Sequence, residues 1–192
     1  MKQVLLIGAG GHCKSCIDVI EQIGEWQIAG IVDRKDSGVE EVLGYPVIGC
    51  DDDLVELRKQ YDYAFVTVGQ IHSAQLKIKL FNRLNEFGFK QPGLVSPLAY
   101  VSKHAQIGEG TIVMHHALIN AAAKIGDNCI INSKALIEHD AMIEKHCHIS
   151  TGATINGGVT VGEQSFIGSN TTTKQTITIP SKSFIKAGTV VK

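Results

Sequence analysis

Residues 1–91 and residues 92–192 carry different hydrophobic patterns. In the first part, short apolar runs alternate with stretches in which apolar residues recur at helical spacing. The pattern predicts strands at 4–7, 28–32 and 64–68 and helices at 17–23, 51–60 and 73–87. Strand–helix alternation is typical of a parallel sheet with right-handed crossovers. We therefore expect residues 1–91 to form a Rossmann-like α/β domain.

A period of six residues follows the turn signals Pro92-Gly93 and Ser96-Pro97. Ile or Val occupies 15 of the 16 successive positions at this spacing from Val101 to Val191, and Thr173 is the exception. The residue four positions later is nearly always small. In a hexapeptide β-helix each hexad forms one face of a triangular prism, and three hexads close a coil. Residues 92–192 are therefore predicted to form a left-handed parallel β-helix.

Composition and charge exclude several classes of protein. Hydrophobic residues make up 44% and aromatic residues only 6%, so aliphatic side chains must fill the core. The formal net charge of -1 does not favour non-specific binding of nucleic acid. No apolar run approaches the roughly 20 residues of a membrane span. The odd number of cysteines favours a reducing compartment, so we expect a cytoplasmic protein. Cys13 and Cys16 form a lone CxxC, and we expect no metal site.

The period also predicts which side chains are neighbours, because residues 18 apart lie one above another in successive coils. The expected columns at one turn are Asn120–Glu138–Asn156, Ala121–His139–Gly157 and Ala122–Asp140–Gly158. A histidine and two acids thus project from one coil, and the coils on either side carry small side chains or none beside the histidine. We expect a notch with a titratable group at its centre.

His139 has the properties of a general base in this notch. A free imidazole titrates near about pH 6.5 and can take up a proton at neutral pH. A neighbouring carboxylate can fix its tautomer, and the N–H of Gly157 could stabilise an oxyanion. A solvated turn without catalytic function would have the same composition of small and polar residues. The residue types alone fit both a catalytic notch and such a turn.

The loop Gly8-Ala9-Gly10-Gly11-His12 partly matches a dinucleotide-binding fingerprint, but Cys13 stands where the third glycine of GxGxxG belongs. The loop precedes a predicted helix, whose N-terminus favours phosphate. Asp33 with Arg34, and Gly69, follow the next predicted strands, and parallel sheets bind ligands at these carboxyl ends. We expect a phosphate or nucleotide here. The alternatives are a turn without ligand and an oxidoreductase module, against which the broken fingerprint argues.

The segments GAGGH (8–12), IEHD (137–140) and HISTGATINGGVTVGEQSFIGS (148–169) resemble the sialic acid O-acetyltransferase NeuD family. This family includes PglD-like N-acetyltransferases of nucleotide-linked 4-amino sugars. The resemblance covers nearly the whole chain and both domains in their order. It implies a homotrimer that binds acetyl-CoA in the cleft between adjacent β-helices.

The resemblance also implies roles for individual residues. His139 would be the general base, assisted by Asp140, and the Gly157 amide would donate to the thioester oxygen. Because some members carry Glu after the histidine, the shorter Asp140 leaves Glu138 as an alternative group to orient the imidazole. The acetyl-CoA positions would be His148, Asn156, Gly157 and Gly158, and the nucleotide-sugar positions Gly8, Gly10, Gly11, His12, Asp33, Arg34 and Gly69.

We therefore expect an acetyl-CoA-dependent acetyltransferase that acts on a bacterial surface-sugar precursor. The favoured reaction is N-acetylation of a UDP-linked 4-amino sugar by direct transfer. No cysteine is expected in the notch, so a covalent acyl-enzyme is not indicated. The alternatives are O-acetylation of sialic or legionaminic acid and a non-catalytic β-helix scaffold.

Overall fold

The computed structural model describes all 192 residues, which fall into two compact units. The N-terminal unit comprises Met1–Gly69 and Gln75–Pro92, and the C-terminal unit comprises Gln70–Ala74 and Gly93–Lys192. The C-terminal unit thus includes a short segment from the middle of the α/β sequence. None of the helices is both long and apolar enough to cross a membrane.

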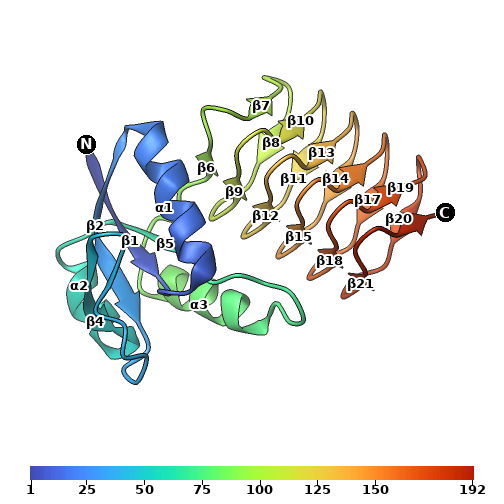
Figure 1. The fold of residues 1–192 in the computed structure, drawn as a ribbon. Coiled ribbons are helices and arrows are strands. Elements are labelled where there is room, and N and C mark those ends of the chain that lie inside the picture. The colour runs from blue at the N-terminus through green and yellow to red at the C-terminus, as the bar shows by residue number, and fades with distance from the viewer. The chain divides into compact units, whose positions relative to one another are not determined.

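The N-terminal unit is built on a five-stranded sheet of order β3-β4-β2-β1-β5 (Figure 1). Its elements are β1 (Lys2–Ile7), α1 (Gly11–Ile23), β2 (Trp26–Asp33), β3 (Glu41–Val42), β4 (Tyr45–Cys50), the 3₁₀ helix η1 (Asp51–Asp53), α2 (Leu54–Arg58), β5 (Tyr63–Val66) and α3 (Gln75–Glu86). Strands β4, β2, β1 and β5 are parallel, and β3 is antiparallel to β4. The predicted α/β architecture is confirmed. Strands β3 and β4 were not predicted, because β3 has only two residues and the apolar run of β4 is interrupted by Pro46 and Gly49.

Helix α1 shows how the sequence positions the first loop of this unit. Its buried side includes both cysteines of the CxxC, and burial raises the pKa of each thiol. Gly24 ends the helix in the left-handed conformation, with φ of 71°, and its N–H donates to the carbonyl of Ile20. The helix therefore packs through apolar positions, which leaves its N-terminal turn, beginning at Gly11, at the end of β1.

The C-terminal unit is a left-handed parallel β-helix with three faces, each made of two-residue strands (Figure 1). The first face holds β6 (Leu94–Val95), β9 (Ile112–Val113), β12 (Ile130–Ile131), β15 (His148–Ile149), β18 (Phe166–Ile167) and β21 (Phe184–Ile185). The second face holds β7 (Tyr100–Val101), β10 (Leu118–Ile119), β13 (Leu136–Ile137), β16 (Thr154–Ile155), β19 (Thr172–Thr173) and β22 (Val190–Val191). The third face holds β8 (Gln106–Ile107), β11 (Lys124–Ile125), β14 (Met142–Ile143), β17 (Thr160–Val161) and β20 (Thr178–Ile179).

Residues 18 apart pair in parallel on every face, as Leu118, Leu136 and Thr154 do on the second. The predicted hexapeptide repeat is thereby confirmed. The aliphatic residue of each hexad points into the prism, and Ile137 and Ile155 are fully buried. The small residues Ala135 and Ala153 fill the interior beside them.

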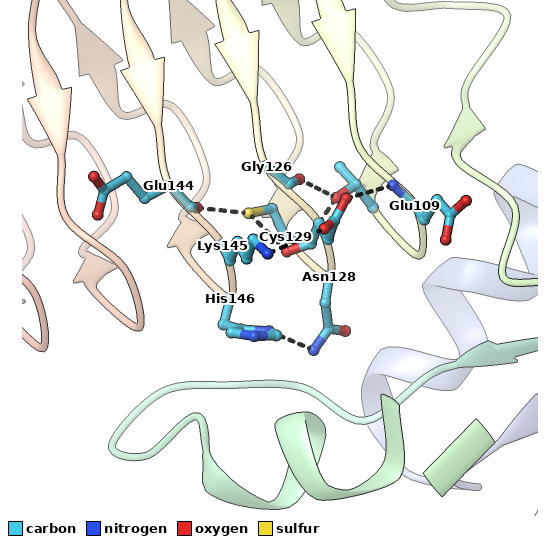
Figure 2. A network of polar contacts seen from close by, with 9 residues as sticks. Glu109, Gly126, Asn128, Cys129, Glu144, Lys145 and His146 are labelled. Carbon is cyan, nitrogen blue, oxygen red and sulfur yellow. Dashed lines mark hydrogen bonds and ion pairs between the residues drawn. The ribbon is translucent and has the colours of Figure 1, made fainter. Parts of the chain in front are cut away.

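The corner between the third and first faces carries an internal ladder of polar groups (Figure 2). Thr111 Oγ1 donates to the carbonyl of Gly126 at 2.8 Å and accepts the Cys129 N–H at 2.9 Å. Cys129 Sγ in turn donates to the carbonyl of Glu144 at 3.1 Å, and the N–H of Cys147 donates to Cys129 Sγ at 3.4 Å. The Thr and Cys side chains at these small positions therefore satisfy backbone groups that the corner would otherwise leave unpaired.

Ile149 tests the packing of this interior. Its side chain is fully buried and its strand pairs with those of Ile131 and Ile167 in the coils on either side. Truncation leaves a cavity between hydrogen-bonded coils that cannot easily close. We expect Ile149→Ala to lower the free energy of unfolding by about 2–5 kcal/mol, measured by urea denaturation with circular dichroism.

Val190 provides the matched control, because its side chain is 65% exposed on the same β-helix. The Val190→Ala change should stay within about 0.5 kcal/mol of the starting protein. Equal losses in the two variants would contradict a core of stacked coils.

Candidate active site

His139 lies on the turn Glu138–Ala141, which connects β13 on the second face to β14 on the third. Ala141 N–H donates to the carbonyl of Glu138 at 3.3 Å, and Asp140 has a φ of 59°. A left-handed third residue is what a type II turn requires. The turn leaves the imidazole accessible, since 59% of the His139 side chain is exposed.

The predicted columns Ala121–His139–Gly157 and Ala122–Asp140–Gly158 are aligned across successive coils. Asp140 N–H donates to the carbonyl of Ala121 at 3.1 Å, and Gly158 N–H donates to the carbonyl of His139 at 3.0 Å. A Cβ added to Gly157 would lie 2.8 Å from Cε1 and 2.9 Å from Nε2 of His139. The imidazole therefore lies directly against the Gly157 backbone, and it can do so because this residue has no side chain.

The two carboxylates of the turn have different partners. Asp140 Oδ2 lies 2.8 Å from His139 Nδ1, whereas Glu138 Oε2 accepts Asn120 Nδ2 at 2.8 Å and the backbone N–H of His139 at 3.3 Å. Asp140, not Glu138, thus contacts the imidazole. Because a carboxylate only accepts, the proton of neutral His139 resides on Nδ1 and the Nε2 lone pair is left to take up a proton.

The same contact raises the pKa of His139 above its usual value. The hydrogen bond that His139 Nδ1 donates to Asp140 is the main cause of the rise. Desolvation opposes it, and the negative charges of Asp140 and Glu138 add smaller upward contributions. The imidazolium that forms when the ring takes up a proton is thus stabilised where it stands.

Two hollows lie on the third face, and the smaller of them adjoins this turn. One of about 250 Å³ is lined by Asp140, Ala122, Lys124 and Met142 among others. The other, of about 480 Å³, shares Lys124 and Met142 and also includes Lys145. Both therefore combine an apolar lining with at least one lysine.

His148 lies on the first face and not at the His139 turn. It is 7% exposed, and its Nδ1 donates to the carbonyl of Gln70. Asn132 Oδ1 accepts the Ser133 N–H, so Asn132 Nδ2 faces His148 Nε2, at 3.1 Å. These contacts fix the His148 tautomer with the proton on Nδ1. A single chain does not bring His148 and His139 together.

Gln70 and Asn132 are the residues that sequence reasoning missed. Gln70 is 2% exposed, and its Nε2 donates to the carbonyl of His146 at 2.8 Å. Its only signal in the sequence was its place after Gly69 at a strand end. Asn132 precedes a turn, where an asparagine is common, so nothing in the sequence marked its contact with His148.

The N-terminal unit brings the predicted nucleotide-binding residues to the carboxyl edge of its sheet. Gly8 N–H donates to the carbonyl of Val32, which ties the glycine loop to β2 one residue before Asp33. A Cβ on Gly69 would lie 3.5 Å from His12 Cβ, so the end of β5 adjoins the start of α1. The N-cap of α1 is Gly10, which provides no side-chain cap, and the first turn has no acidic residue. Nothing lies within 4 Å of a Cβ placed on Gly11.

A separate cleft of about 390 Å³ adjoins this edge and is lined by Asp33, Arg34, Lys35 and Ser37 among others. Arg34 is exposed there and lies 3.5 Å from Asp36. The glycine loop does not line this cleft. No cluster of three or more histidine, cysteine or acidic side chains in the chain is arranged to hold a metal ion.

Replacement of Asp140 tests the cause of the shifted imidazole pKa. Asparagine keeps the size of the side chain and tolerates the left-handed backbone, but it carries no charge. We expect Asp140→Asn to lower the pKa of His139, measured by NMR titration of the imidazole. Glu138→Gln should lower it less, because Glu138 acts only through its charge. An equal or larger shift in Glu138→Gln would contradict this assignment.

Comparisons with known proteins identify both units. Residues 3–84 match the PglD N-terminal domain, and residues 104–139 match the bacterial transferase hexapeptide family. Over 118 residues the chain is 33% identical to UDP-N-acetylbacillosamine N-acetyltransferase of Bacillus subtilis (strain 168). This match covers 59% of the chain and 52% of the relative, which is about half the length of the relative.

Solved structures match the whole chain. The chain superposes with a TM-score of 0.93 and 35% identity on a histidine variant of perosamine N-acetyltransferase from Caulobacter crescentus with CoA and GDP-perosamine, and covers 89% of it. It superposes with a TM-score of 0.90 and 32% identity on the acetyltransferase domain of PglB from Neisseria gonorrhoeae FA1090, and covers 92% of it. Both matches include 100% of this chain. The chain belongs to the family of sugar N-acetyltransferases that join a PglD-type N-terminal domain to hexapeptide repeats.

Proposed function

We propose that this protein transfers the acetyl group of acetyl-CoA to the amino group of a nucleotide-linked amino sugar. The observation that carries the proposal is the arrangement of Asp140, His139 and Gly157, which aligns a carboxylate, an imidazole and a backbone amide. The relatives support the same class of acceptor, because their names specify N-acetylation of bacillosamine and perosamine nucleotides.

His139 acts as the general base in the proposed reaction. The neutral amine attacks the carbonyl carbon of the thioester, and a C–N bond forms while Nε2 of His139 takes one amine proton. The electron pair of the carbonyl moves onto its oxygen, which accepts a hydrogen bond from the Gly157 N–H. The C–S bond then breaks, and the thiolate takes the proton back from the imidazolium. Asp140 holds the ring and stabilises its charged form throughout.

We propose that acetyl-CoA binds along the third face beside the His139 turn. The hollows there offer an apolar lining at Met142 for the pantetheine chain and the cations Lys124 and Lys145 for phosphate groups. Asn156, Gly157 and Gly158 form the turn one coil beyond His139, next to which the thioester would lie.

A homotrimer is part of this proposal. His148 and His139 lie on different faces, so both can act at one acetyl-CoA only if a second copy of the chain supplies one of them. The second face offers a contact surface, because it carries Tyr100 at 61% exposure, with the partly exposed Leu118 and Leu136 on the next two strands. The reducing environment favoured by five unpaired cysteines fits a cytoplasmic enzyme.

We propose further that the N-terminal unit binds the nucleotide. The uncapped first turn of α1 offers the N–H group of Gly11 to a phosphate. The cleft at Asp33 and Arg34 lies at the next strand end and could hold the remainder of the nucleotide.

The reaction and the base are tested together. An acetyl-transfer assay over UDP- and GDP-linked 4-amino sugars and sialic acids, analysed by mass spectrometry, should give an N-acetylated nucleotide sugar and free coenzyme A. His139→Ala should lower kcat by about 10²–10⁴-fold without lowering the thermal stability. His104→Ala, a second exposed histidine in the Asp140 column, should leave kcat unchanged.

Three outcomes would count against the proposal. Acetylation of a sialic acid hydroxyl alone would support the O-acetyltransferase alternative. Absence of coenzyme A release with every acceptor would support a scaffold. Unchanged turnover in His139→Ala would remove His139 from the mechanism.

Phosphate binding at the N-terminus of α1 can be tested separately by substitution of Gly11. An aspartate fits at this position and favours the helix N-terminus, but its charge repels a bound phosphate. We expect Gly11→Asp to weaken UDP or GDP binding by about ten-fold or more relative to the uncharged Gly11→Asn, measured by calorimetry. Equal affinities of the two variants would place the phosphate elsewhere.

A further inference from the structure

Among the residues that directly follow a strand from Ser96 to Lys174, Asn156 is the one that leaves the backbone ladder between coils. The residue after each two-residue strand otherwise donates its N–H to a carbonyl 17 residues later, as Asn120 does to Ile137 and Glu138 to Ile155. Asn156 instead donates to the side-chain hydroxyl Oγ1 of Thr173, at 2.9 Å. Thr173 is also the only non-aliphatic residue at the repeating inward position. The residue that breaks the aliphatic column, Thr173, is thus the same residue whose side chain replaces a backbone acceptor in the ladder.

The altered ladder changes what the Asn156 side chain does. Because the Thr173 hydroxyl takes the Asn156 backbone N–H, the Thr173 carbonyl is left without that donor. Asn156 Nδ2 donates to this carbonyl instead. A carbonyl oxygen can only accept, so the donor must be the NH₂ group of the amide side chain. The side chain is thereby held on Thr173.

Because the Asn156 side chain bonds Thr173, it does not bond the next backbone amide, that of Gly157. In the two preceding coils the equivalent amide is capped by the side chain before it: Asn120 Oδ1 accepts the Ala121 N–H at 2.7 Å, and Glu138 Oε2 accepts the His139 N–H at 3.3 Å. Asn156 makes no such bond, and Gly157 N–H donates to no group of the chain.

The unpaired amide is unusual because of where it lies. Gly157 is buried, whereas every other residue at this turn position of the β-helix is at least partly exposed. His139 Nε2 would lie 2.9 Å from a Cβ on Gly157, so the amide adjoins the proposed base. An unpaired N–H in a buried residue is costly unless a ligand accepts from it.

We propose that Thr173 and Asn156 are positioning residues that keep the Gly157 N–H open for the acyl oxygen. The inference rests on the proposed function, since the open amide is given a role in acetyl transfer. Thr173 acts by drawing the Asn156 amide away from Gly157, and neither residue reacts. A valine at 173, like the Ile and Val of the other coils, would return the Asn156 N–H to the backbone carbonyl. The freed side chain would then cap Gly157 as Asn120 caps Ala121.

Thr173→Val tests the inference because it replaces the hydroxyl by a methyl group of similar size. We expect kcat for acetyl transfer to fall by about 10–100-fold, within the loss known for an oxyanion donor, with the KM of the sugar unchanged. The acidic limb of the pH profile should not move, because Asp140 and His139 are untouched. A crystal structure of Thr173→Val should place Asn156 Oδ1 within hydrogen-bond distance of the Gly157 N–H.

A second substitution that restores kcat would show that Thr173→Val acts through the position of Asn156 and not through a general loss of structure. In the double variant Thr173→Val with Asn156→Ala no side chain remains to cap Gly157, so most of the lost kcat should return. Thr111→Val is the matched control: Thr111 is also fully buried and bonded to backbone groups, and this variant should lose stability but keep kcat.

Wild-type kcat in Thr173→Val would overturn the inference, and so would a lack of rescue in the double variant. The crystal structure of Thr173→Val tests the exchange of hydrogen bonds independently of which sugar is acetylated. If the Asn156 side chain still bonds the carbonyl of residue 173 in that structure, the inference is also overturned. Failure of the unaltered protein to acetylate any amino sugar would instead refute the proposed function.

Discussion

The backbone hydrogen bonds between coils are the constraint on which the β-helix and its candidate site depend. Each coil of eighteen residues pairs in register with the next on three faces, so a side chain's neighbours are fixed by its position in the repeat. Aliphatic residues then stack inside, and corner residues stack outside. A histidine at a corner can have a bare neighbour only where the residue eighteen positions later is glycine, as at Gly157. Because the coils are in register, the backbone of Gly157 lies next to the His139 imidazole and leaves room for it.

The same register sets the chemistry of the turn. The left-handed conformation recurs at the Asp140 column, with φ of 62° at Ala122 and 67° at Gly158. This backbone brings the carboxylate of Asp140 onto Nδ1 of the preceding residue, His139, although the two are adjacent in sequence. A shorter acid suffices here because the turn, and not the length of the side chain, supplies the reach. Glu138, the first residue of the turn, accepts a hydrogen bond from Asn120 in the neighbouring coil instead.

Sequence reasoning predicted the β-helix and the His139 column because both follow from a period. It did not predict β3, which has only two residues, or β4, whose apolar run contains Pro46 and Gly49. The assignment of Gln70–Ala74 to the C-terminal unit, and with it the contact of Gln70 with His148, depends on packing between distant segments. The choice between Asp140 and Glu138 likewise required coordinates, because both acids adjoin the histidine in the sequence.

Thr173, the one break in the aliphatic column, helps to explain the neighbouring turn as well as the core. Thr173 was visible in the sequence as a break in the aliphatic column, and such a break in a stacked core has a cost in apolar packing. The hydroxyl offsets part of that cost through the bond from Asn156 N–H. An Ile or Val would pack at least as well, as it does at the other fifteen positions. A polar residue at this position is therefore better explained by its effect on the neighbouring coil, where it redirects Asn156 beside the His139 imidazole, than by its contribution to the core.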